Sequence, residues 1–169
     1  MRIAIIENGA VARVITGGSN WQDVFPGAEG IPSDTANVGD LWDGTAIVPP
    51  APPPPTADDL RAFAAAKRFA VETGGIAFEG STIATDRVSQ QMISGAFSFT
   101  QTRPEETIAF KADTGWIDLD ADQVAAIATA VAGHVQACFA AERAVDAEIS
   151  NGTILTFEEV DAAAWPANG

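Results

Sequence analysis

The sequence predicts an α+β protein with a small N-terminal β unit, a proline-rich linker, and a C-terminal domain of β-hairpins with one long α-helix. Three observations lead to this prediction. β-Rich runs broken by turn residues fill residues 1–48, prolines dominate residues 49–55, and an apolar helical period extends from Asp120 to Ile149. The expected divisions are 1–48 for the β unit, 49–55 for the linker, 56–150 for the helix and hairpin domain, and 151–169 for a short helix and tail.

Two hairpins are predicted in the N-terminal unit, over residues 2–15 and 41–48. Asn8-Gly9 can supply the positive φ angles of a tight turn in the first hairpin, and Asp43-Gly44 marks the turn of the second. Because a lone hairpin is only marginally stable in water, the first one must pair with further structure. The irregular stretch between the hairpins is expected to be anchored on the first hairpin by Trp21 and Phe25.

The proline run at residues 49–55 cannot enter the interior of a helix or a sheet, because proline lacks the amide hydrogen. It predicts an extended segment of roughly 22 Å, at about 3.1 Å per residue. A ligand for a proline-binding domain would carry a flanking basic residue, and none adjoins this run. We therefore interpret it as a stiff spacer between two folded parts.

The C-terminal domain is predicted to alternate helices and hairpins. Thr56 caps a helix that ends at Gly74-Gly75, and Thr85 or Asp86 caps another that ends before Pro104. The second of these helices carries a set of apolar residues on one side: Val88, Met92, Ile93 and Phe97. The expected hairpins are 76–83, around Glu79-Gly80, and 107–119, around Asp113-Thr114-Gly115.

The long helix over 120–149 organises this domain. Asp120 and Gln123 form the spacing of a capping box, and Asn151-Gly152 supplies the stop. Its apolar positions recur at three- and four-residue steps, with Glu142 as the charged exception: Val124, Ile127, Ala128, Val131, Val135, Cys138, Val145 and Ile149. At 1.5 Å per residue the helix is roughly 44 Å long, so it is expected to pack along its own domain or along neighbouring copies. A second capping box, Thr156 with Glu159, opens a short helix closed by Trp165-Pro166.

The chain is acidic, with a net charge of −14. Such a surface repels phosphate backbones, which disfavours nucleic acid as a ligand. Glu7-Asn8-Gly9 ends the first apolar run too early for a signal peptide, and no stretch reaches the ~18 apolar residues of a membrane span. We therefore expect synthesis in a cytoplasm and no membrane span.

No catalytic, cofactor-binding or metal-binding residue is predicted, and the chain is not expected to be an enzyme. Asp118, Asp120 and Asp122 have the opening spacing of a calcium loop, but the later positions of that loop do not match. His134 is expected to be packed or hydrogen-bonded, and Cys138 to be a buried hydrophobe. Gly17-Gly18 and Gly74-Gly75 lack the strand and helix context of a dinucleotide site and are predicted turns.

Several ordered motifs resemble a domain of unknown function found in bacteriophage tail-region proteins, over about half the chain. The motifs are Lys67-Arg68-Phe69, Glu72-Thr73-Gly74-Gly75-Ile76, Thr85-Asp86-Arg87-x-Ser89-Gln90, Phe110-Lys111-Ala112, Gly115-Trp116 and Ala132-x-His134-Val135-Gln136-Ala137-Cys138-Phe139-x-x-Glu142. In addition, Ile6-Glu7-Asn8-Gly9, with a later proline run into a helix, is similar to the start of small phage tail-fibre and fibre-assembly proteins. Within the motifs, residues 85–90 are interpreted as a helix start, and Trp116, His134 and Val135 as core.

The resemblance implies a location in the virion tail after synthesis in the bacterial host cytoplasm. It implies a structural component of the tail tip or tail-fibre region that contacts other phage tail proteins, in a possible homotrimer. The alternative is a tail-fibre assembly chaperone that is absent from the finished particle. A hydrolase of the host envelope is the remaining class, and it would need opposed carboxylates or a metal cluster in a cleft.

Overall fold

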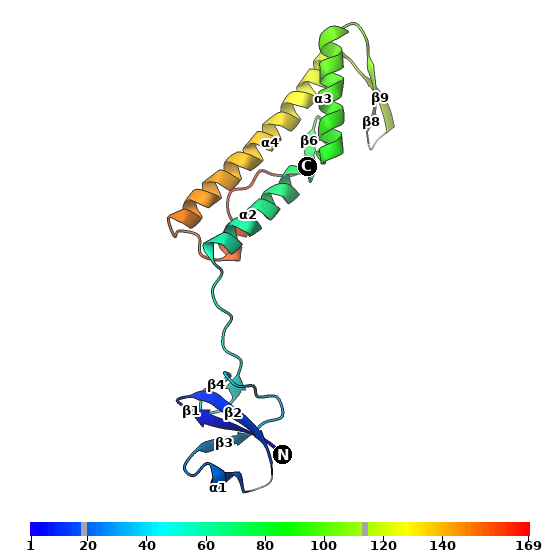
Figure 1. Ribbon diagram of the computed structural model, residues 1–169. Coiled ribbons are helices and arrows are strands. Elements are labelled where there is room, and N and C mark those ends of the chain that lie inside the picture. The colour runs from blue at the N-terminus through cyan, green and yellow to red at the C-terminus, as the bar shows by residue number, and fades with distance from the viewer. Residues whose placement is uncertain (18–19, 113–114) are drawn as a thin grey trace. The chain divides into compact units, whose positions relative to one another are not determined.

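A computed structural model describes residues 1–17, 20–112 and 115–169. The chain divides into two compact units, Met1–Pro53 and Pro54–Gly169, so that the boundary falls within the proline run (Figure 1). The structure confirms the α+β class with several hairpins and one long helix.

The first unit is a five-stranded antiparallel sheet in the order β3-β1-β2-β4-β5. Asn8 and Gly9 have φ angles of 54° and 76° and form the predicted β1–β2 turn. Strand β3 pairs with β1 along the edge and was not predicted, because its Gly30 and Pro32 are poor strand formers and pairing with β1 decides its conformation. The elements are β1 (Arg2–Glu7), β2 (Ala10–Thr16), α1 (Trp21–Val24), β3 (Glu29–Pro32), β4 (Leu41–Trp42) and β5 (Ile47–Val48).

Strand β1 is the centre of this unit because both of its faces are buried. Its four residues from Ile3 to Ile6 are all at most 7% exposed. The ring of Trp21 lies against Gly30 of β3, where any larger residue would overlap with it. Phe25 lies under the guanidinium of Arg13 on β2, 5.5 Å from ring centroid to Cζ. The two aromatic residues thus contact β3 and β2 respectively.

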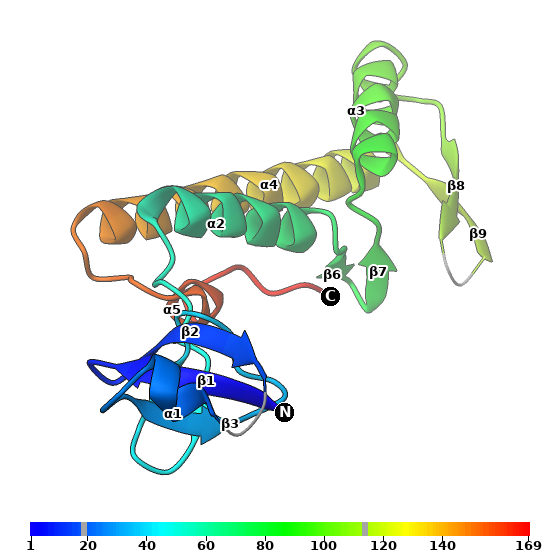
Figure 2. The same cartoon turned by 60° about the horizontal axis from the view of Figure 1, so that its bottom comes forward.

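The second unit contains every helix and hairpin that the sequence predicts for residues 56–169. Figure 2 shows α2 alongside one half of α4 and α3 crossing at the other end. Segment 151–169, which was predicted as a separate part, belongs to this unit: Val160 of α5 is fully buried, and the amide of Gly169 donates to the Gly75 carbonyl. The elements are α2 (Ala57–Glu72), β6 (Ile76–Phe78), β7 (Ser81–Ile83), α3 (Arg87–Thr102), β8 (Ile108–Ala112), β9 (Gly115–Leu119), α4 (Ala121–Ser150) and α5 (Phe157–Asp161).

Side-chain caps fix the helix starts. Thr56 with Asp59, Asp120 with Gln123, and Thr156 with Glu159 are reciprocal capping boxes. Helix α3 begins at Arg87, directly after its cap Asp86, whose carboxylate accepts from the amides of Val88 and Ser89. Asp120 is therefore a helix cap, and no group of three or more metal-ligating side chains occurs among the described residues.

Helix α4 joins two hydrophobic clusters. Val124, Ile127 and Val131 enter the first cluster, with β6, β7 and α3, while Val145 and Ile149 enter the second, with α2 and α5. Cys138 lies between these two sets of residues on α4 and is fully buried. The predicted apolar stripe is thus the buried face of the helix, with Val135 and Glu142 half-buried.

The assignment of Trp116 to the core was wrong, and two of the apolar residues predicted on one side of α3 are exposed. Trp116 is 72% exposed, because the β8–β9 hairpin packs only the face that carries Ile108 and Leu119, and Trp116 points to the other side. On α3, Val88 and Met92 are 63% and 65% exposed, because the helix turns its Ile93 side toward α4. Of the residues in the predicted turns, Gly18, Asp113 and Thr114 lie outside the described residues.

Candidate functional site

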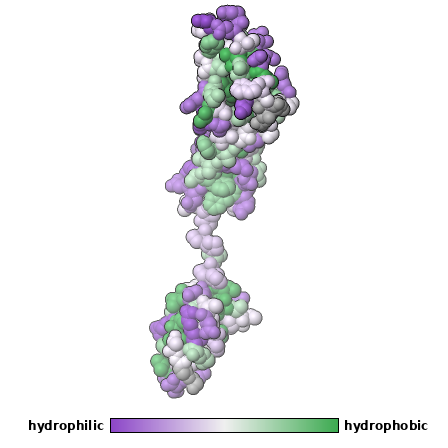
Figure 3. All heavy atoms as spheres, turned by 90° about the vertical axis from the view of Figure 1, so that its right-hand side faces the viewer, coloured by the Kyte–Doolittle hydropathy of each residue, from purple (hydrophilic) through white to green (hydrophobic). Residues whose placement is uncertain are grey.

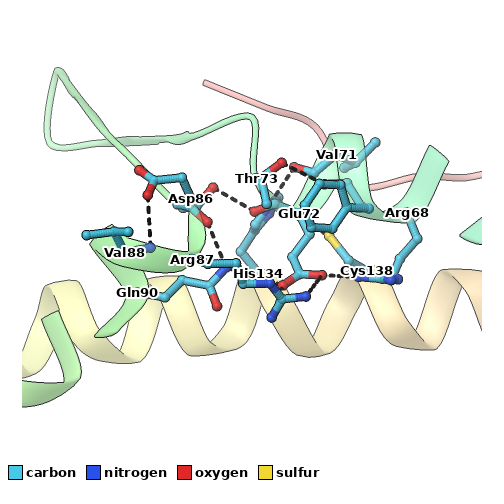
Figure 4. Close-up of polar contacts among 12 residues, drawn as sticks. Arg68, Val71, Glu72, Thr73, Asp86, Arg87, Val88, Gln90, His134 and Cys138 are labelled. Carbon is cyan, nitrogen blue, oxygen red and sulfur yellow. Dashed lines mark hydrogen bonds and ion pairs between the residues drawn. The ribbon is translucent and has the colours of Figure 1, made fainter. Parts of the chain in front are cut away.

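The candidate site surrounds Glu72, the last residue of α2, whose side chain is 0% exposed. Arg68, one helical turn earlier, forms an ion pair with one carboxylate oxygen. Arg87, from the first turn of α3, places Nη1 2.9 Å from the other oxygen. The amide nitrogen of Gln90 donates to the same oxygen at 3.2 Å. Two cations and one amide therefore hold this buried carboxylate (Figure 4).

Arg68 extends the site onto α4. Its Nε donates to Glu142 at 2.8 Å, and its guanidinium lies over the ring of Phe139, 4.5 Å from the centroid. The Arg87 guanidinium is likewise 5.7 Å from the centroid of Phe69. Each arginine thus combines an ion pair with a contact to an aromatic face, a pairing for which the planar guanidinium is suited.

Thr85 closes the turn at the C-terminal end of α2. Its hydroxyl is fully buried, donates to the Glu72 carbonyl at 2.6 Å and accepts from the Gly75 amide at 2.9 Å. Gly75 has a φ of +88°, a conformation that favours glycine. Of the two residues predicted as alternative caps, Asp86 caps α3. Thr85 instead forms hydrogen bonds with the backbone of the turn that follows α2.

His134 and Cys138 of α4 lie beside this network. His134 is half-buried, and its Nε2 is 3.1 Å from the Val71 carbonyl oxygen. The Cys138 sulfur is 3.6 Å from the same nitrogen. Burial raises the pKa of the Cys138 thiol, and the negative charge of Glu72 raises it further. At neutral pH the thiol therefore stays protonated, which is the opposite of what a nucleophilic cysteine needs.

This arrangement links α2, α3 and α4 through ionic contacts. Both oxygens of Glu72 are occupied by donors from α2 and α3, and Arg68 carries the connection to α4. Sequence reasoning singled out none of these ionic contacts. The one local signal was the four-residue spacing of Arg68 and Glu72 on a helix. The motifs that carry the family resemblance contribute most of the side chains gathered here.

Beside this network, two hollows open along α3. One lies between α3 and α4 and has a volume of about 420 Å³, with Gln90, Phe97, Val131 and Gln136 among its lining residues. The other, of about 230 Å³, lies between α3, β8 and α4 and is almost wholly apolar, with Met92, Phe110 and Ile127 in its lining. Figure 3 views this side of the second unit and shows hydrophobic side chains among polar ones. The core at this end can therefore be reached from the surface through these hollows.

The second unit is thus an α+β domain in which three helices, α2, α3 and α4, are tied together at a buried carboxylate. Residues 55–164 match the family described as Domain of unknown function (DUF4376), and the chain belongs to that family. No curated protein and no solved structure matches the chain.

Proposed function

We propose that the chain is a structural component of a bacteriophage tail, in the tail tip or tail-fibre region, and that it acts through protein–protein contacts. The tail location is supported by the motif resemblance in residues 67–142. The protein-contact role is supported by the outer face of the second unit, and one feature of that face carries the proposal.

That feature is the α3 apolar surface, formed by Val88, Met92 and Phe99, which lie on one side of the helix. Their exposed fractions are 63%, 65% and 41%. Large apolar side chains grouped on a surface mark interaction sites in proteins that are otherwise polar outside. Met92 also lines the 230 Å³ apolar hollow, so a partner side chain that covers this surface has a depression to enter.

Mass spectrometry of purified phage particles tests the tail location. The proposal expects peptides of this chain in the particle at a fixed ratio to the major tail protein. Their absence from particles, with the chain abundant in infected cells, would instead support the assembly chaperone.

A substitution tests the α3 apolar surface. Met92→Glu should reduce incorporation into particles by at least about tenfold, because it places a charge where an apolar contact forms. Gln91→Glu is the matched control, since Gln91 is exposed on the adjacent position of the same helix. Equal incorporation of both variants would show that this surface does not make the contact.

A further inference from the structure

The outer face of α4 is an exposed surface that carries no charge. Between Asp122 and Glu142 the helix has no Asp, Glu, Lys or Arg, and His134, which lies in this stretch, is half-buried against α2, although the chain as a whole has a net charge of −14. Figure 1 shows that α2 and α3 leave the opposite long side of α4 without a neighbouring helix, although Asp122 and Ala126 at the start of α4 also line a hollow beside β6 and β7. The face consists of small residues, of which all but Ala130 are exposed: Ala126, Ala130, Gly133, Ala137, Ala140 and Ala144.

A helix that is apolar all round is normally buried. The most apolar 18 residues of α4 have a mean hydropathy of 1.6, yet only 22% of them are buried. By length and composition α4 also meets the criterion for a membrane span, which core helices of water-soluble proteins meet as well. Its solvent side therefore has the composition of a contact surface.

We propose that this face binds the same face of a second copy in antiparallel orientation. Charge complementarity favours this pairing. Asp122 and Arg143 are both exposed, stand at opposite ends of the uncharged stretch, and lie on the same flank of the helix, 21 residues apart. An antiparallel pair centred near Gly133 brings Asp122 of each copy opposite Arg143 of the other. Two symmetric ion pairs then flank an uncharged contact.

A parallel arrangement has the reverse electrostatics. In a parallel bundle, including the three-fold one that the family resemblance suggests, Asp122 lies beside Asp122 and Arg143 beside Arg143. Like charges at such positions disfavour association. Antiparallel helices also oppose their dipoles, which adds to the same preference. The charges of α4 therefore favour a two-fold dimer.

The size of the face indicates how stable this dimer is. From Asp122 to Arg143 the helix extends about 32 Å and is about 10 Å wide, so the contact falls short of the ~800 Å² per partner that stable complexes bury. The small side chains permit close approach, and a Cβ added at Gly133 would meet no other atom of the chain. We therefore expect a weak, reversible dimer that is populated at concentrations of about 100 µM. This inference does not depend on the tail role, which particle composition tests separately.

Analytical ultracentrifugation of the full chain tests the dimer. At about 100 µM the protein should sediment as a dimer, and Ala137→Glu should sediment as a monomer with unchanged helical circular dichroism. The matched control is Ala66→Glu, at an exposed alanine in the middle of α2. A monomer at every concentration, a trimer, or equal dimerisation by both variants would overturn the proposal. Binding of the wild type, and not of Ala137→Glu, to phosphatidylcholine vesicles would assign the face to a membrane and would also overturn it.

A charge exchange tests the orientation. Asp122→Arg and Arg143→Asp should each weaken the dimer roughly tenfold, and the double variant should restore it, because the exchanged charges again attract. Glu158→Arg is the control for Asp122→Arg, since Glu158 is likewise an exposed acid two residues after a helix cap. Failure of the double variant to recover would contradict the antiparallel pairing. A disulfide between two copies of Ala126→Cys would demonstrate a parallel pairing and contradict it as well.

Discussion

Replacing Glu72 by glutamine is expected to destabilise the second unit more than any comparable change at an ion pair on its surface. The substitution keeps the size of the side chain and removes its charge. Arg68 and Arg87 then lose the carboxylate that they share. Arg68 retains Glu142, and the half-exposed Arg87 can be solvated by water.

The expected loss follows from these surroundings. Removing one partner of a buried ion pair costs about 3–5 kcal/mol, because a buried charge is left without compensation. Since both arginines keep some compensation here, we expect the low end, about 3 kcal/mol. For a unit of this size that corresponds to a fall in Tm of about 12 °C.

Circular dichroism at 222 nm during urea and thermal unfolding measures this effect. All helices except the four-residue α1 belong to the second unit, so the helical signal reports on that unit. The matched control is Asp146→Asn, which removes a carboxylate that joins α4 to α2 through Arg61 at 2.7 Å, in an exposed pair. Such pairs contribute little. If Glu72→Gln costs no more than Asp146→Asn, Glu72 does not tie the helices together as we argue.

Four further predictions concern the core, the thiol, a helix cap and the linker. Ile127→Ala should lower the free energy of unfolding by about 3 kcal/mol, because it leaves a buried cavity. Gln123→Ala removes half of a capping box and should lower it much less. A loss below about half a kilocalorie per mole at Ile127 would place this residue outside the core. The Cys138 thiol should react with iodoacetamide at pH 7 only after unfolding, since it is buried and its pKa is raised, and rapid labelling of the folded chain would contradict that position. Hydrogen bonds from the Ser89 side chain and from the amides that Asp86 caps lower the pKa of the Asp86 carboxylate below 3.8, so the stabilisation by this cap is complete above that value and is lost as the pH falls through the lowered pKa. Asp86→Asn keeps a cap and removes the titration, so this variant should lose less stability than the wild type on acidification below about pH 4. Identical acid transitions of the two proteins would refute this. Limited proteolysis should cleave first within residues 46–59 and leave a helical C-terminal fragment, whereas equal resistance along the chain would mean that the proline run is packed against other structure.

Local rules predicted most of the fold because the helices and hairpins are specified by residues close in sequence. The Asp120 cap, the apolar period that follows it and the Asn8-Gly9 turn are all present as expected. Strand β3 has no such local signal, because Gly30 is required by the ring of Trp21 and not by the strand itself. Only the tertiary contact with the Trp21 ring explains why residue 30 is a glycine.

The candidate site was less predictable because it depends on contacts between distant segments. Burial of Glu72 arises where α2, α3 and α4 meet, and nothing in the neighbourhood of one residue reveals that it will be fully enclosed. Trp116 shows the converse. A tryptophan favours burial on average, but the alternation of a two-stranded hairpin leaves one face outside, and pairing with Lys111 places Trp116 on it.

The antiparallel packing of α2 against α4 has a mechanical consequence. A pull on the chain through the proline run enters the second unit at the start of α2, next to the end of α4. The ion pairs Arg61–Asp146 and Arg68–Glu142 lie across the seam between these helices, so a force along α2 loads them together in shear. Elements pulled in shear resist more strongly than elements that are peeled apart one contact at a time. A load that reaches α2 through the linker therefore meets the exposed Arg61–Asp146 pair first and the less exposed Arg68–Glu142 pair further along the same seam.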